Sequence, residues 1–227
     1  AEQFFNKAFS EGDVPEDISL AEMLQHGWCP HDDKAARVLN TALIATADHE
    51  LNASSFAARV VASAGATPYA AVMAGLSALQ GVKHGGHTER VGALFDAIGS
   101  ADNIQRELQA RLRRGESIPG FGHKLYTEAD PRATILFDAL EAHYGDTPAF
   151  AFVEALITHA HDLIGDFPTI DVLLVATSRV LTLPRGSALT LFALGRTIGW
   201  VGQAIEQYNT DRLIRPRARY TGNHPVA

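Results

Sequence analysis

The sequence has almost no cysteine, with one residue, Cys29, among 227. A single cysteine cannot form a disulfide within the chain, and such usage fits a reducing compartment. Long apolar runs are also missing, since none approaches the about 18 residues of a membrane-spanning helix. The N-terminus lacks the basic and then apolar order of a signal peptide. We therefore expect a cytoplasmic protein that does not enter a membrane.

An excess of positive charge is missing as well. The formal net charge is -7 and the pI about 5.8, so the chain has no overall basic surface for nucleic acid or an anionic membrane. Hydrophobic residues make up 46% and charged residues 20%, which is ordinary for a folded globular domain. The chain is long enough for one sizeable domain, or for one domain and part of another.

Alternation of apolar and polar residues, the mark of a half-buried strand, is hard to find over more than four positions. Apolar residues instead recur at helical spacing, and proline or capping residues stand where several such segments begin. The sequence therefore predicts an all-α protein, with short helices and loops in its first 34 residues. Longer helices are expected over 34–49, 56–64, 68–79, 88–98, 101–113, 131–143, 148–164, 171–180 and 187–207.

Two of these helices have a specific expected apolar face. Val38, Ala42 and Ala45 share one face of the first helix, and His49 falls next on that face. The apolar spacing of the second helix is Phe56, Val60, Val61 and Ala64.

The stretch 118–132 combines a tight loop with polar side chains. One proline and two glycines mark a loop whose backbone can approach a ligand closely. His123 closes that loop. Asp130 before Pro131 is the capping order that opens a helix, which puts Arg132 in the first turn. An imidazole and a guanidinium on one rigid corner suit a substrate with a carbonyl and a carboxylate. The alternative is a Gly-Pro turn with a surface histidine.

Four further polar residues are candidates for chemistry. If the fold gathers them, buried ionisable groups perturb one another's pKa and form an acid–base centre. Three have a purely structural alternative: His49 as a hydrogen-bonded residue on a helix face, His84 as the cap of a turn and Asp171 as a helix N-cap. Arg196 interrupts an apolar run, where a guanidinium needs a buried anion.

Metal binding competes with this interpretation, because the chain has ten histidines. His84 and His87 are three residues apart, but two glycines separate them. His159, His161 and Asp162 include a His-Asp pair like that of all-helical metal phosphohydrolases. Residues two apart, however, point to different faces of a helix. This cluster is better explained as a solvated helix end, and no metal is expected.

Several motifs together resemble the citrate synthase family in order and spacing, from about Asp32 to Gly222. They are Ala47-Asp48-His49-Glu50-Leu51-Asn52-Ala53-Ser54, His84-Gly85-Gly86, Pro119-Gly120-Phe121-Gly122-His123 with Asp130-Pro131-Arg132, Phe192-Ala193-Leu194-Gly195-Arg196 to Trp200, and Arg215-Pro216-Arg217. The resemblance implies an all-helical homodimer whose large and small domains close over oxaloacetate and acetyl-CoA. Residues 1–83 and 187–227 would belong to the large domain and 84–186 to the small one, with the usual N-terminal helices of the large domain absent.

The reaction implied is the condensation of acetyl-CoA, a co-substrate, with oxaloacetate to give citrate and CoA, a step of the tricarboxylic acid cycle. By resemblance, Asp171 removes a proton from the acetyl methyl group and His84, as a neutral imidazole, hydrogen-bonds the enol oxygen. His123 polarises the oxaloacetate carbonyl and protonates it. This agrees with general chemistry, because a carboxylate base needs a positioned donor for the developing enolate. No permanently bound cofactor is required.

The remaining roles concern binding. His49, Arg132 and Arg196 would hold the hydroxyl or carboxylates of oxaloacetate, since arginine forks bind carboxylates bidentately. Arg215 would be supplied by the partner subunit. The loop that would lie against coenzyme A consists of Pro119, Gly120, Phe121 and Gly122.

Two departures from the family pattern put substrate choice and activity in question. The usual Asn-Val-Asp is replaced by Thr169-Ile170-Asp171, and the usual Gly-Gly-Ala-Asn by Gly85-Gly86-His87-Thr88. The alternatives are a 2-methylcitrate synthase, a citryl-CoA lyase, or a non-catalytic relative that binds a CoA ester or a partner protein. The chain is far shorter than a full citrate synthase, so we expect a fragment or a compact member that depends on its dimer partner.

Overall fold

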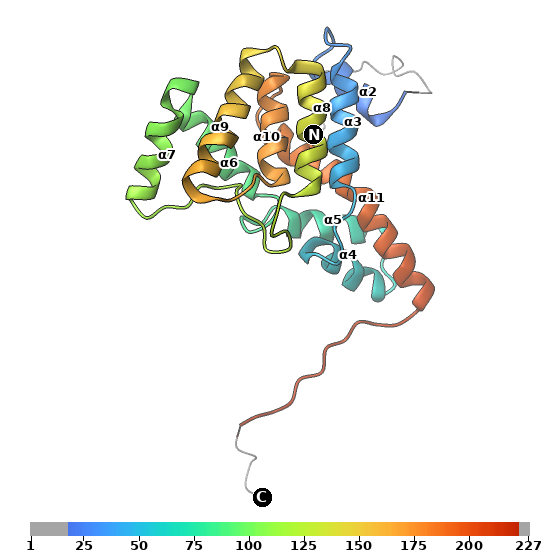
Figure 1. Cartoon of the computed structure of the whole chain (residues 1–227). Helices are drawn as coiled ribbons and strands as arrows, with labels where there is room; N and C mark the ends of the chain where they lie inside the picture. Colours follow the sequence, from blue (N-terminus) through green and yellow to red (C-terminus); the bar gives the residue numbers. More distant parts are fainter. Residues whose placement is uncertain (1–17, 223–227) are drawn as a thin grey trace, which may run out of the picture.

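The computed structural model describes residues 18–222 and is all-α over that range, apart from one isolated bridge between Phe121 and Pro168. The all-α prediction is thereby confirmed for these residues (Figure 1). Of the short helices expected near the N-terminus, any before residue 18 lie outside the described residues. The helices are α2 (Leu20–Trp28), α3 (Ala35–Thr46), α4 (Ala53–Ser63), α5 (Pro68–Leu79), α6 (His87–Ile98), η1 (Ala101–Asn103), α7 (Ile104–Arg113), α8 (Pro131–Tyr144), α9 (Pro148–Ile164), α10 (Ile170–Val180) and α11 (Ser187–Thr210).

The core is built around α10. This helix packs against α3, α6, α8, α9 and α11, and all its residues from Val172 to Thr177 are buried. A helix that is apolar on every side must lie inside the fold. The long α11 joins this core to α4 and α5, which it also contacts. Figure 1 shows α4 and α5 beside α11, below the remaining helices.

Capping residues explain where several helices begin. Thr67, Asp130 and Thr147 each accept a backbone hydrogen bond from the first turn of α5, α8 and α9, and each precedes a proline. Such a residue satisfies a backbone N–H that has no partner within the helix, and proline lacks the N–H altogether. The prolines had predicted these three starts from the sequence.

The expected helix through His49 was wrong, because α3 ends at Thr46 and His49 lies in the loop before α4. Two features end the helix early. Glu50 has a positive φ of 54°, and Asn52 caps α4 by accepting from the backbone of Ser54 and Ser55. A residue that caps a new helix cannot continue the previous one. His49 is therefore held by a loop.

The expected apolar face of α4 was also wrong. The face that α4 buries consists of Ser54, Ser55, Ala58 and Ala62. Phe56, by contrast, is 44% exposed. Small side chains let α4 lie close to α11, where the Trp200 indole donates to Ser54 Oγ at 3.1 Å. The larger apolar side chains are consequently left at the surface.

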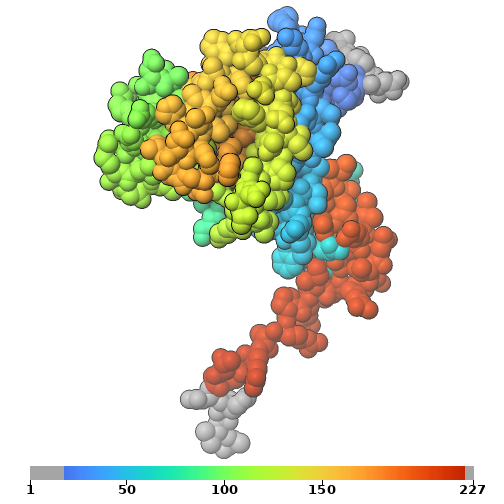
Figure 2. Space-filling model, in the orientation of Figure 1, coloured from blue at the N-terminus to red at the C-terminus, as the bar shows by residue number. Residues whose placement is uncertain are grey.

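The C-terminal end of α11 and the chain that follows it extend away from the core. In Figure 2 the end of α11 and the chain after it form the red surface that projects from the other helices, and residues 212–222 are non-helical and largely exposed. Among the helices of residues 18–222, none combines the length and apolarity that a membrane crossing requires.

Candidate active site

A cavity of about 560 Å³ brings most of the predicted site residues together. Its lining includes His49, His84, Gly120, Phe121, Gly122, His123, Arg132, Asp171 and Arg196, together with His87 and Thr169. Two predicted residues lie elsewhere: Pro119 is buried outside the lining and Arg215 is exposed in the C-terminal tail. The three groups expected to carry chemistry therefore share one space, although they come from different parts of the chain.

His84 is held at the start of the His-Gly-Gly turn by a buried hydroxyl. Its Nε2 lies 2.9 Å from Ser54 Oγ, which also accepts from the Trp200 indole and lies 2.8 Å from Asn52 Oδ1. The single Ser54 hydroxyl hydrogen can go to Asn52 or to His84. When it goes to Nε2, the neutral ring carries its own hydrogen on Nδ1 and can donate from there. Burial, helped by Arg196, lowers the pKa of His84 to about 4, so the ring is neutral at pH 7.

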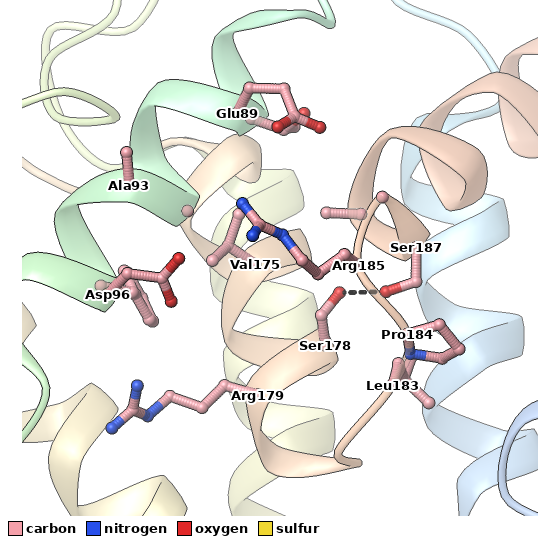
Figure 3. Close-up of a pocket in the computed structure, with 15 residues that line it drawn as sticks. Glu89, Ala93, Asp96, Val175, Ser178, Arg179, Leu183, Pro184, Arg185 and Ser187 are labelled. Carbon is pink, nitrogen blue, oxygen red and sulfur yellow. Dashed lines mark hydrogen bonds between the residues drawn. The ribbon is translucent and has the colours of Figure 1, made fainter.

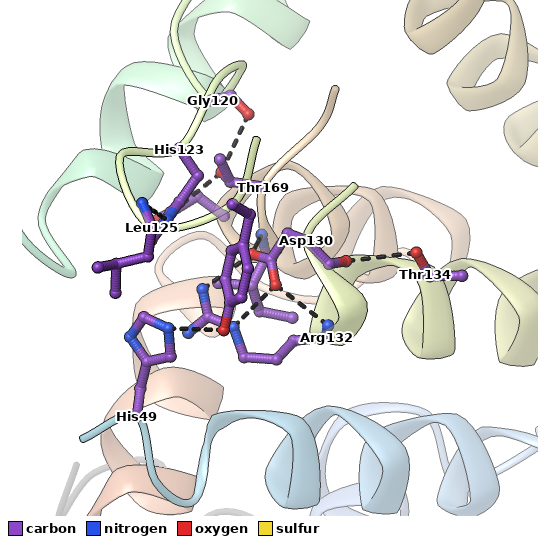
Figure 4. Close-up of polar contacts among 11 residues, drawn as sticks. His49, Gly120, His123, Leu125, Asp130, Arg132, Thr134 and Thr169 are labelled. Atoms are coloured by element: carbon purple, nitrogen blue, oxygen red, sulfur yellow. Dashed lines mark hydrogen bonds and ion pairs between the residues drawn. The ribbon is translucent and has the colours of Figure 1, made fainter. Parts of the chain in front are cut away.

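His49 lies across the same cavity, in contact with the 118–130 loop. Its Nε2 is 2.9 Å from the Tyr126 hydroxyl, and its ring meets the His123 ring edge-on at 5.5 Å. Burial and then the positive charge of Arg132 lower the pKa of His49 to about 4. Figure 4 shows His49, His123 and Arg132 in this group of polar contacts. A neutral His49 can hydrogen-bond a polar ligand without adding charge.

His123 has a tautomer that its own loop determines. The backbone N–H of Leu125 donates to His123 Nδ1 at 3.1 Å. In the neutral ring the hydrogen must then be on Nε2, which becomes a donor. Burial, followed by Arg132, lowers the pKa of His123 from its usual value. The ring also lies on Tyr126, 4.8 Å between centroids.

Asp130 joins the start of α8 to the start of α10. Its two oxygens accept from Arg132 Nε and Nη2 at 2.9 and 2.8 Å, and Oδ2 also accepts the backbone N–H of Ile170 at 3.1 Å. The carboxylate is 1% exposed. Although burial acts in the other direction, the hydrogen bonds and charge of Arg132 hold the pKa of Asp130 below its usual value. Sequence reasoning had found only its capping role, because Ile170 is 40 residues away.

Asp171 lies in the first turn of α10 with one oxygen unpartnered. Oδ2 is 3.3 Å from the Thr169 hydroxyl, whereas Oδ1 is buried without a hydrogen bond. Burial raises the pKa of Asp171 to about 6, against the opposing effect of Arg132. The group is thus mostly ionised at pH 7 but is a stronger base than an ordinary aspartate.

Arg196 is a buried cation facing the cavity from α11. It is 1% exposed, and its Nε donates to the Thr46 carbonyl at 2.6 Å. Its Nη2 is buried with no partner, and none of the ion pairs of the described residues includes it. Burial and then Arg132 lower its pKa to about 10. A buried guanidinium with an unused N–H is arranged for an anionic ligand.

The competing cluster at the end of α9 lies apart from the cavity. His159 Nδ1 is 2.8 Å from Ala155 O, and His161 Nδ1 is 3.3 Å from Asp166 O. Within residues 18–222, no group of three or more histidine, cysteine or acidic side chains has a geometry that could hold a metal ion. Both histidines thus have backbone contacts that account for their positions.

The cavity can support proton transfer at carbon next to a carbonyl. It holds one carboxylate base, neutral imidazoles with free donors, and two guanidinium groups for an acidic substrate. The sequence did not identify Ser54, Tyr126 and the second role of Asp130. Ser54 stands two residues after the helix-capping Asn52, which was the only local signal for it.

Comparisons with known proteins find a family model and curated relatives that are similar to this chain. Residues 6–217 match the family model described as "Citrate synthase, C-terminal domain". "Citrate synthase 2" of Bacillus subtilis (strain 168) is 36% identical over 215 residues, which cover 91% of this chain and 57% of that protein. The match to the relative is thus close to the full length of this chain, whereas the chain spans little more than half of the relative.

Solved structures share the fold. The ternary complex of carboxymethyl coenzyme A and oxaloacetate with citrate synthase from Thermoplasma acidophilum superposes with a TM-score of 0.78 at 30% identity, covering 94% of this chain and 59% of that one. Citryl-CoA lyase from Hydrogenobacter thermophilus superposes with a TM-score of 0.80 at 24% identity, covering 93% of this chain and 87% of that one. At this identity the second likeness concerns the fold alone.

Proposed function

The chain belongs to the citrate synthase family, and from this premise we propose that it catalyses the condensation of acetyl-CoA with oxaloacetate to give citrate and CoA. The observation that carries the proposal is the shared cavity of Asp171, His84 and His123. A base, an enol-stabilising donor and a carbonyl-polarising donor are the groups that this reaction needs. The match to the family model and to the curated relative confirms the family resemblance found in the sequence. The substrates remain part of the proposal.

The first step is enolisation. Asp171 takes a proton from the methyl carbon of the acetyl thioester, and the electron pair of that C–H bond moves to the thioester carbonyl. His84 donates a hydrogen bond to the oxygen on which charge develops. This requires the hydroxyl hydrogen of Ser54 to point at Nε2, so that His84 donates from Nδ1. The raised pKa of Asp171 brings it closer to the pKa of the methyl C–H group, so the proton transfer is less unfavourable.

The second step forms the carbon–carbon bond. The enol carbon attacks the keto carbon of oxaloacetate, while the Nε2–H of His123 hydrogen-bonds the keto oxygen on which charge develops. This oxygen becomes the hydroxyl group by gaining a proton through His123, which balances the proton that Asp171 took, so that the imidazole ends the step neutral. Arg132 and Arg196 bind the carboxylates, and His49 the hydroxyl or a carboxylate. Two nitrogens of Arg132 are engaged by Asp130, which leaves Nη1 for the ligand. Hydrolysis of the resulting citryl thioester then releases citrate and CoA.

The chain would act as a homodimer formed through α4, α5 and α11. These helices contact one another and expose large apolar side chains, including Tyr69 at 83%, Met73 at 68% and Ile198 at 69%. A monomer rarely leaves such side chains together in water, so a second copy is proposed to cover them. The C-terminal tail with Arg215 leaves the helices at the end of α11 (Figure 1), from where it would reach the partner's site.

The activity is tested by free thiol release when the purified chain is mixed with oxaloacetate and acetyl-CoA. The expected result is CoA release that needs both substrates and is abolished in Asp171→Asn. Propionyl-CoA and citryl-CoA serve as parallel substrates for the acyl preference and for the cleavage direction. Calorimetric binding of acetyl-CoA without any turnover would contradict the proposal and favour a non-catalytic relative.

The shared site is tested by mixing two inactive dimers, Asp171→Asn and Arg215→Ala. If Arg215 acts across the interface, half of the dimers are mixed after exchange of subunits, and each mixed dimer has one intact site out of two. About a quarter of the activity then returns. If Arg215 serves its own chain, mixing restores nothing. Light scattering on the same samples reports the oligomeric state.

A further inference from the structure

Two residues that depart from the expected family pattern, His87 and Thr169, meet at the backbone of a single residue, Gly120. His87 and Thr169 are 82 positions apart in the sequence, yet both contact Gly120 of the glycine loop. The backbone N–H of Gly120 donates to His87 Nε2 at 3.0 Å. The Gly120 carbonyl accepts from the Thr169 backbone N–H at 2.8 Å and from the Thr169 hydroxyl at 2.9 Å.

Gly120 has no freedom to form these contacts in another way. Its φ is +88°, and a Cβ there would lie 2.5 Å from Val172 and 2.9 Å from Val91. The glycine therefore lies against α6 and α10 with no gap. A peptide packed this closely passes any displacement on to α10, whose first turn carries Asp171.

His87 is the acceptor in this arrangement, which fixes its tautomer. Nε2 receives the Gly120 N–H and must be unprotonated, so the neutral ring carries its hydrogen on Nδ1. Burial, together with the charge of Arg90, lowers the pKa of His87 and favours this neutral state. The side chain lines the cavity from the start of α6, three residues after His84. It thus connects the His84 turn to the glycine loop.

Thr169 connects the same peptide to the base. Its hydroxyl is buried and lies 2.9 Å from the Gly120 carbonyl and 3.3 Å from Asp171 Oδ2. The shorter contact takes the hydroxyl hydrogen in the free enzyme, and the other oxygen of Asp171 has no partner. Asp171 is therefore little constrained by hydrogen bonds of its own and depends on the position of its helix end.

We propose that His87 and Thr169 are positioning residues that act as one clamp on the backbone N–H and carbonyl of Gly120, and so set the distance from the glycine loop and the His84 turn to Asp171. The consequence for catalysis rests on the proposed function, whereas the clamp itself does not. His87 contacts the backbone N–H of Gly120, whereas Thr169 contacts its carbonyl oxygen.

The clamp is tested first without substrate. Replacing His87 with Leu removes the acceptor, and amide hydrogen exchange at Gly120 is expected to rise about tenfold. Replacing it with Gln keeps an oxygen near the position of Nε2 and should restore most of the protection. Thr169→Val should have a similar effect to His87→Leu, and Thr169→Ser should restore protection. The ¹⁵N chemical shift of His87 Nε2 should be that of an unprotonated ring nitrogen.

A double variant separates one clamp from two independent contacts. If the peptide is released when either side is lost, His87→Leu with Thr169→Val has about the effect of the stronger single variant. A combined effect equal to or larger than the product of the two would overturn the proposal. Matched controls are His159→Leu and Thr177→Val, whose side chains bond only to carbonyls of their own helices; they should leave Gly120 exchange unchanged.

Kinetics then test the positioning role. His87→Leu is expected to lower kcat about tenfold while the KM for oxaloacetate stays within about twofold, because the clamp acts on the base and the acyl side. His87→Gln should recover kcat, because its side-chain oxygen can accept from the Gly120 N–H. His87→Asn, which is too short to reach that N–H, should not recover kcat. A purely steric effect of Leu would not produce this difference between Gln and Asn. Full kcat and unchanged Gly120 exchange in His87→Leu would overturn the clamp. Loss of protection in a chain without any turnover would instead leave the clamp standing and reject the proposed function.

Discussion

Two cavities that are each lined in part by α6 and α10 differ in how their buried polar groups are paired. The second, of about 350 Å³, lies between α6, α10 and the start of α11 (Figure 3). Its buried hydroxyls pair with each other, since Ser187 donates to Ser178 at 2.8 Å. Arg179 donates to the Gly99 carbonyl and lies over the Phe152 ring. Among the described residues that line the second cavity, no buried side-chain polar atom is left without a partner; Glu89, Asp96 and Arg185 of this lining are exposed.

The first cavity leaves comparable groups unsatisfied. Asp171 and Arg196 each have a buried polar atom without a partner. Leaving such groups unpaired costs folding free energy, of the order of 1–3 kcal/mol each. The difference indicates that a cavity alone does not identify a ligand-binding site in this fold, whereas buried charged side chains with an unpartnered polar atom do. Replacing a charged group of the first cavity is therefore expected to reduce activity without lowering the free energy of unfolding. Replacing a group of the second cavity is expected to lower the free energy of unfolding and leave activity unchanged.

The largest effect is expected for Asp171→Asn. Removing the base should lower kcat about 10³-fold, while the free energy of unfolding at pH 7 rises by about 1–2 kcal/mol. The gain follows from the raised pKa of Asp171, about 6. An unfolded aspartate ionises near pH 4, so the cost of the folded carboxylate grows between about pH 4 and 6 and is constant above. Urea unfolding of both proteins at pH 4 and 7 measures this difference; a variant less stable at pH 7 would contradict it.

Arg196→Met should weaken substrate binding without lowering the free energy of unfolding. The KM for oxaloacetate is expected to rise about 100-fold, because a buried charge partner of a carboxylate is lost. Methionine fills a similar volume without the buried charge, so the free energy of unfolding should not fall. Thiol-release kinetics and denaturant unfolding are the two measurements. A marked loss of stability with unchanged KM would assign Arg196 a structural role only.

The pH dependence follows from the same groups. Asp171 must be ionised to act as base, so kcat/KM should fall about tenfold per pH unit below about pH 6 and be level above it. His49 and His84, whose pKa is lowered to about 4, stay neutral through this range and add no second limb. A kcat/KM that stays level from pH 7 down to about pH 5 would contradict the raised pKa of Asp171.

Ser54→Ala tests the support beneath His84 and should have a smaller effect. Without the hydroxyl, Nε2 of His84 loses the partner that the proposed mechanism requires as a donor, and kcat should fall about tenfold. The Trp200 indole loses its acceptor, so the free energy of unfolding should fall by about 1 kcal/mol. Ser55→Ala is the matched control, because the neighbouring hydroxyl is buried with no partner at all; its removal should change neither quantity adversely.

Ser187→Ala in the second cavity should have the smallest effect. It breaks the pair with Ser178, which lowers the free energy of unfolding by about 1 kcal/mol or less. Activity should be unchanged, since neither serine lies in the first cavity. A clear loss of activity without a loss of stability would show that the second cavity also takes part in function.

Local sequence signals predicted much of the fold but misplaced residues whose surroundings are distant. The starts of α5, α8 and α9 followed from a capping residue before proline, which is a property of adjacent residues. The buried face of α4 did not, because its small residues pack against α11, whose Trp200 is 146 positions from Ser54. The position of His49 failed for a related reason, since helical spacing does not reveal that Asn52 begins a new helix.

By itself, the sequence determined the helical class, most helix starts, and the motifs that identify the family, because these depend on residues close together in the chain. Through resemblance it also named many of the residues that line the cavity, although Pro119 and Arg215 lie outside the lining. Only the tertiary structure decided that Asp171, His84 and His123 meet, that Asp130 ties two helices together, and that His87 and Thr169 hold one peptide. Burial, hydrogen-bond partners and pKa depend on atoms from distant segments, so they exist only once the chain has folded.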